Sequence, residues 1–129
     1  MLLHEHKNQW KNNEKLLNWL QSQKCTYFDW LIIITFYTVL HKMDELIHQK
    51  FPGYDKRNET KKNTGHAYRN KMVGKYYKSV HSEYDSLYRK SRKVRYEQRK
   101  LNKIKTKDLK KYIDIWVNTI KPLKPYPTS

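Results

Sequence analysis

The sequence predicts an all-α domain, an up-and-down bundle of four or five helices. Its one long apolar run, Trp30 to Leu40, lies in a stretch without Gly or Pro that continues to about Phe51. The segments on either side are polar, with apolar residues that recur in helical steps of three and four. Helices with such stripes bury them against one another, so the apolar run should form the central helix.

The first helix is expected from Leu3 to about Gln23. Its stripe consists of apolar residues at helical spacing in a polar background: Leu3, Trp10, Leu16, Leu17, Trp19 and Leu20. The connection to the next helix, Gln21 to Cys25, is short. A short link favours antiparallel packing of the two helices.

The central helix is expected from Tyr27 to about Lys50. Leu31 to Val39 is rich in β-branched and aromatic residues and would also fit a strand, but the length of the pattern favours a helix. Thr26 and Asp29 form a capping signal at its start. The run is shorter than the ~18 residues that a membrane span needs, and polar residues bracket it. We therefore expect a core helix and no contact with a membrane.

Residues 55–65 have no periodicity and many turn formers, which predicts a loop. Its basic residues are candidate nucleic-acid contacts: Lys56, Arg57, Lys61 and Lys62. A stripe from His66 to Val94 then predicts a third helix near 66–78 and a fourth near 81–100. Thr106 should cap the last helix and Pro122 should close it. We expect one domain, 1–121, and an extended tail, 122–129.

The charge balance favours a polyanionic partner. Lys and Arg number 28 against 12 Asp and Glu, a formal charge of +16. Such a charge attracts nucleic acid through phosphate contacts, although it can also serve solubility alone. The single cysteine, Cys25, allows no internal disulfide, and charges begin too early for a signal peptide. A cytoplasmic protein is expected.

Polar residues gather near one face of the central helix at His41, Asp44, Glu45 and His48. Two imidazoles and a carboxylate at this spacing can bind a transition metal. Helices also collect polar residues on one face without a ligand, and we expect neither a metal nor a cofactor. In another interpretation His41 lies beside Asp44 and acts as a base or a phosphate ligand. A buried histidine with satisfied hydrogen bonds is the structural alternative.

Two further groups of residues are suited to bind phosphate. His66 and Arg69 face the same way one turn apart near a helix N-terminus, where backbone N–H groups favour anions. A capping histidine and a surface arginine are the simpler explanation. The fourth helix interleaves tyrosines with cations, a pattern that can hold RNA by stacking and phosphate contact. Its candidate residues are Arg89, Arg92, Lys93, Arg95, Tyr96 and Arg99. A solvated basic face is the alternative here.

Three pieces of the sequence occur in an order that resembles a known family. They are Phe36-Tyr37-x-x-Leu40-His41, His66-x-x-Arg69, and Tyr84-x-x-Leu87-x-x-x-Ser91-Arg92-x-x-Arg95-Tyr96. Together they resemble small prokaryotic HEPN-like proteins, over about residues 27–97. The resemblance implies a dimeric helical bundle in a superfamily whose active members cut RNA without a metal. It also implies a role in toxin–antitoxin or other defence systems, with an antitoxin or nucleotidyltransferase-like partner.

The sequence departs from the usual HEPN catalytic motif, in which a His follows an Arg at short distance. The nearest pairs here, Arg57 with His66 and Arg69 with His81, are farther apart. If the protein is an enzyme, we therefore expect a metal-independent endoribonuclease with a rearranged site. Its catalytic residues would be His41, His66, Arg69 and Arg95. The alternative is a non-catalytic bundle that binds nucleic acid or an acidic protein.

Overall fold

The computed structural model describes residues 2–54, 65–96 and 106–125, with only the backbone of Tyr96. Within these ranges the regular elements are helices and no strand is present, which confirms the predicted all-α class. No helix in the described ranges combines the length and apolarity that crossing a membrane requires. Several predicted contacts lie outside the described residues: Lys56, Arg57, Lys61, Lys62, Arg99 and the Tyr96 side chain.

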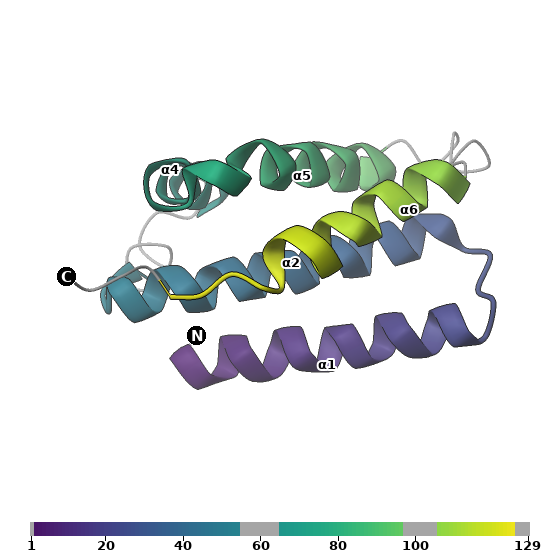
Figure 1. Cartoon of the computed structure of the whole chain (residues 1–129), viewed down its shortest axis with the longest axis horizontal. Helices are drawn as coiled ribbons and strands as arrows, with labels where there is room; N and C mark the ends of the chain where they lie inside the picture. The colour runs from purple at the N-terminus through teal and green to yellow at the C-terminus, as the bar shows by residue number, and fades with distance from the viewer. Residues whose placement is uncertain (1, 55–64, 97–105, 126–129) are drawn as a thin grey trace.

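Helices α1 (Leu3–Ser22) and α2 (Phe28–Lys50) pack side by side and antiparallel, as the short connection predicts. Figure 1 shows α2 in the middle of the molecule, with α1 on one side and the α4–α5 layer on the other. Because α1 and α2 are antiparallel, the start of α1 lies beside the end of α2. Helix α4 lies at this same end of the bundle, and the candidate site forms there.

Helix α2 supplies the largest part of the core. Ile32, Phe36, Val39 and Met43 on this helix have no solvent exposure. Its threonines are also buried, and Thr35 donates a hydrogen bond to the Leu31 carbonyl at 2.6 Å. This bond to the preceding turn satisfies a hydroxyl that would otherwise be costly to bury. The length of the apolar pattern thus indicated the helix correctly, despite its β-branched residues.

The turn between α1 and α2 is a Schellman motif. The Cys25 N–H donates to the Leu20 carbonyl at 3.1 Å, and the Lys24 N–H donates to the Gln21 carbonyl at 3.0 Å. Lys24 takes the left-handed conformation, φ 53°, that glycine usually occupies in this motif. The capping signal predicted at Thr26 is wrong, because α2 is capped by Tyr27 and no side chain bonds the free N–H groups there.

Helix α4 (Gly65–Tyr76) leads through a 3₁₀ turn (Lys78–Val80) into α5 (His81–Tyr96). The predicted break near residue 80 is confirmed. The two helices are close at Gly74, where a Cβ would lie 3.4 Å from His81 Nε2, in van der Waals contact with the ring. The His81 ring also makes a 2.7 Å hydrogen bond with Asn70 Oδ1 on α4. These contacts fix α4 against the start of α5.

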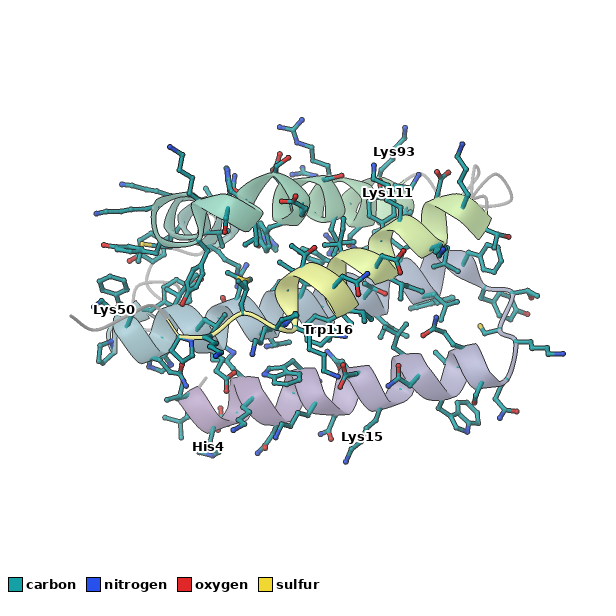
Figure 2. The ribbon with its side chains drawn as sticks, viewed as in Figure 1. His4, Lys15, Lys50, Lys93, Lys111 and Trp116 are labelled. Atoms are coloured by element: carbon teal, nitrogen blue, oxygen red, sulfur yellow. The ribbon has the colours of Figure 1, made fainter. Side chains whose placement is uncertain are left out.

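The last helix, α6 (Thr106–Asp114), continues as a π-helical segment (Ile115–Ile120). Figure 2 shows Trp116 between this segment and α1. Its ring packs edge-on against Trp10, and its Nε1 donates to Glu14 Oε2 at 3.0 Å. Lys121 Nζ lies 2.8 Å from the same oxygen. The C-terminal helix therefore closes the core over α1 and α2.

Candidate functional site

Asp44 and Arg69 form a buried ion pair between α2 and α4. Arg69 Nε donates to Asp44 Oδ1 at 2.6 Å and Arg69 Nη2 donates to Oδ2 at 3.0 Å. The carboxylate is 2 % exposed and the arginine 9 %. A fork of this kind fixes the plane of the guanidinium group. Arg69 is therefore held in one orientation, with Nη1 as the nitrogen that does not contact Asp44.

Two buried tyrosines complete the surroundings of this pair. The Tyr54 hydroxyl donates to Asp44 Oδ1 at 2.8 Å, and the Tyr84 hydroxyl accepts a hydrogen bond from Arg69. Burial opposes the charge of Arg69, but Asp44 more than offsets this and raises the pKa of the guanidinium above its ordinary value. Burial likewise raises the pKa of Tyr84. The arginine is thus charged and the tyrosine neutral at neutral pH.

His66 stands at the surface end of this network. Arg69 Nη1 lies 3.2 Å from His66 Nδ1, and because arginine only donates, Nδ1 must accept. The His66 ring is exposed and packs on Tyr88, with 5.1 Å between the ring centroids. Burial of part of the ring is the largest cause that lowers the pKa of His66, and the positive charges of Arg69 and Arg95 lower it further. His66 is therefore a neutral imidazole beside a fixed cation.

His41 belongs to the opposite side of the network. Its Nδ1 lies 3.3 Å from Nδ1 of His6 on α1, and His6 Nδ1 lies 3.9 Å from Asp44 Oδ2. The structure thus connects His41 to His66 through His6, Asp44 and Arg69. The predicted proximity of His41 to Asp44 is present, because their ligand atoms and that of His6 lie within 4.8 Å of one another.

Arg95 reaches the site from the far half of α5. Its Nη1 donates to the Tyr37 hydroxyl at 2.9 Å, and its guanidinium carbon lies 5.7 Å from the centroid of the Tyr37 ring. Arg92, a turn away on α5, contacts the Tyr88 hydroxyl at 3.3 Å. The positive charges of both arginines lower the pKa of His66. The charges of three guanidinium groups, those of Arg69, Arg92 and Arg95, therefore act on one exposed imidazole.

The other predicted cations on α5 are exposed. Lys93 is exposed and projects outward from the helix in Figure 2. Arg89 is also exposed and forms a 2.9 Å ion pair with Asp85 one turn earlier. A surface pair of this kind contributes little to stability. These side chains are available to a polyanion without any rearrangement of the core.

A pocket of about 410 Å³ lies beside the site, between the end of α2 and α4. Tyr54 lines it and carries the hydroxyl that binds Asp44. The Tyr54 and Tyr68 rings stack with 5.5 Å between their centroids. The lining combines aromatic, basic and small residues: Phe51, Pro52, Gly53, Tyr54, Tyr68, Lys71, Met72, Lys75 and Tyr76. Rings and ammonium groups together suit a planar base and its phosphate.

Large apolar side chains are exposed around the junction of α1 and α2. Trp19 is 59 % exposed and Trp30 is 57 % exposed. Leu16 and Tyr27 are also exposed in these helices. Exposed apolar side chains mark a surface where proteins associate when they form one contiguous patch.

Sequence reasoning missed two members of the network, His6 and Tyr54, and it named Tyr84 in a motif without giving it a role in the site. His6 was detectable, because it stands one turn before Trp10 in the buried stripe of the first helix. A polar residue in an apolar stripe needs a partner. Tyr54 follows the turn at Pro52 and Gly53 that ends α2, where no periodicity in the sequence indicates which way a side chain faces.

Comparisons with protein-family models, curated proteins and solved structures found no match to this chain.

Proposed function

We propose that the protein is an RNA-directed, HEPN-like helical bundle and a metal-independent endoribonuclease. The observation that carries this proposal is the pairing of His66 Nδ1 with Arg69 Nη1 at 3.2 Å, while Asp44 holds the other side of the guanidinium group. An exposed neutral imidazole beside a fixed cation supplies a general base and a charge for the phosphate, two groups that serve metal-free cleavage of RNA. The resemblance to HEPN-like proteins supports the role in a toxin–antitoxin or defence system.

In the proposed reaction an RNA phosphate takes the place of His66 as the partner of Arg69 Nη1. This exchange frees Nδ1 of His66 to accept the proton of the ribose 2′-OH. The 2′ oxygen attacks phosphorus, and the 5′ oxygen leaves with a proton from water. The products carry a 2′,3′-cyclic phosphate and a 5′-OH. Arg69 stabilises the negative charge that develops on the phosphate oxygens, with Arg95 or Arg92 beside it.

His41, the other candidate base, does not take the proton in this proposal. Its Nδ1 faces His6 rather than the arginines of α5, so we assign the proton transfer to His66. Arg95 keeps its proposed role on the phosphate. Asp44, which contacts Arg69 and not the substrate, is a positioning residue.

The aromatic pocket supports a nucleic acid as the substrate. A base that stacks on Tyr68 would bring its phosphate near Lys71 and Lys75, which are exposed. Tyr54 connects the floor of the pocket to Asp44. An RNA strand bound there would therefore contact Tyr54, whose hydroxyl group binds the carboxylate that orients Arg69.

The exposed tryptophans support the proposed homodimer. Trp19 and Trp30 are each more than half exposed, and a second copy of the chain would remove them from water. An antitoxin or nucleotidyltransferase-like protein is the partner that the family resemblance implies.

The test is incubation of labelled RNA with the purified protein in EDTA. We expect the wild type to cut the RNA and His66→Ala to lose at least about a hundredfold in rate, the usual contribution of a general base. His4→Ala is the matched control, because His4 is an exposed histidine on the outer side of α1 (Figure 2). Equal cutting by wild type and His66→Ala would exclude His66 as the base.

A non-catalytic bundle is the second candidate. The exposed cations Arg89, Arg92 and Lys93 on α5 favour it, since they can bind a polyanion without any histidine. In that case RNA stays intact, and replacing the three cations by Gln weakens binding and flattens its salt dependence.

A further inference from the structure

Two histidine nitrogens face each other between α1 and α2. His6 Nδ1 and His41 Nδ1 lie 3.3 Å apart, and the ring centroids are 5.5 Å apart. His6 is 3 % exposed, whereas His41 is half-buried. A proton on one Nδ1 could form a hydrogen bond to the other Nδ1. A metal ion bound to the lone pairs of both Nδ1 atoms would account for the short distance equally well.

The separation of the two nitrogens matches that of two ligands on one zinc ion. Zinc binds imidazole nitrogen at about 2.0–2.1 Å, so two nitrogens in a tetrahedral site lie about 3.4 Å apart. The observed 3.3 Å needs almost no adjustment.

Asp44 provides a third ligand in the right position. Its Oδ1 accepts hydrogen bonds from Tyr54 and from Arg69 Nε. Its Oδ2 accepts from Arg69 Nη2 at 3.0 Å and lies 3.9 Å from His6 Nδ1. One ion would bind all three ligand atoms, which lie within 4.8 Å of one another, if they draw together to the spacing of about 3.4 Å of a tetrahedral site. A carboxylate ligand that is itself hydrogen-bonded is usual in metal sites.

We propose that His6, His41 and Asp44 bind a divalent transition-metal ion, and that the ion is Zn²⁺. Two imidazoles and one carboxylate suit zinc better than the oxygen-preferring Mg²⁺ or Ca²⁺. A water molecule would be the fourth ligand. The charge of Arg69 on the same carboxylate opposes the cation, so binding is weaker than in closed four-ligand sites. This site goes beyond the proposed RNA cleavage, in which the ion has no role, and it would clamp α1 to α2.

The experiment titrates ZnCl₂ into the full chain after treatment with EDTA and its removal by dialysis. Calorimetry should show one ion bound per chain, and His6→Ala and His41→Ala should each weaken binding at least about tenfold. At a hundredfold excess over Kd, zinc should raise the Tm of the wild type by about 5 to 10 °C. His4→Ala and Cys25→Ser are the controls and should bind as the wild type does.

Co²⁺ provides a readout that does not depend on the folding of a variant. In the wild type it should give the intense visible absorption of a four-coordinate site, and Zn²⁺ should displace it. Absence of zinc binding by the wild type, or equal binding by His6→Ala and His41→Ala, would overturn the proposal. The weak spectrum of six-coordinate Co²⁺ would also overturn it. The two histidines would then share a proton in a hydrogen bond.

Discussion

Arg69 donates hydrogen bonds to both oxygens of Asp44, from Nε at 2.6 Å and from Nη2 at 3.0 Å, in the interior between α2 and α4. This relationship does two things at once. It holds α4 against the end of the central helix, and it directs the remaining nitrogen of the guanidinium group at His66. Stability and the proposed chemistry therefore depend on the same pair.

Asp44→Asn should destabilise the protein strongly. The change leaves the charge of Arg69 buried without its partner, a loss of about 3 to 5 kcal/mol in the free energy of unfolding. Urea denaturation measures this change in the free energy of unfolding. Asp85→Asn is the matched control, because it removes the exposed Arg89 pair on α5 and should cost about 0.5 kcal/mol or less. Equal effects of the two changes would mean that the buried pair does not hold the bundle together.

His66 should titrate below the usual histidine value of about 6.5. Partial burial and the guanidinium groups of Arg69, Arg95 and Arg92 lower its pKa, and Asp44 opposes them. A lowered pKa keeps the imidazole neutral at pH 7, so the acid limb of the cleavage rate should also lie below 6.5. NMR of the ring protons measures the titration directly.

Arg95→Gln should move the pKa of His66 upward, because it removes one of the charges that lower it. Arg89→Gln on the same helix is the control and should leave the titration unchanged, since Arg89 is paired with Asp85. A wild-type His66 that titrates above 6.5 would contradict the surroundings described here.

Tyr68→Ala should weaken RNA binding by about 1 to 3 kcal/mol, the contribution of one stacked base. Lys71→Gln should weaken binding in a salt-dependent way and lower the slope against log salt by about 1. Fluorescence anisotropy with labelled RNA at several salt concentrations measures both. Lys15→Gln on the outer side of α1 (Figure 2) is the control for charge. Unchanged binding by Tyr68→Ala would show that the pocket does not hold a base.

Trp30→Glu should convert the proposed homodimer to a monomer. The Trp30 ring is 57 % exposed in the single chain, and a carboxylate buried in an interface without a partner is costly. Analytical ultracentrifugation measures the mass. Val117→Glu is the control, because Val117 is also exposed but lies on the C-terminal π-helical segment. A wild-type protein that sediments as a monomer at all concentrations would contradict the homodimer.

The sequence predicted the helices well and the site only in part. A long apolar pattern without Gly or Pro was enough to locate α2, although the capping signal predicted at Thr26 was wrong. His66 and Arg69 were paired correctly because both lie on one helix, where spacing determines the face. The role of Asp44 as their anchor depends on how α4 packs on α2, which spacing within one segment cannot show. His6 pairs with a residue of another helix, so its role required the three-dimensional arrangement.

The most direct test of the proposed reaction compares RNA with fully 2′-O-methylated RNA of the same sequence, in EDTA. Both strands offer the same phosphates and bases to Arg69 and the tyrosine pocket, but only RNA has a 2′-OH for His66 to deprotonate. We expect both to bind, and only RNA to be cut, with 2′,3′-cyclic phosphate ends. Cutting of both strands, or binding of both without cutting of either, would contradict the account.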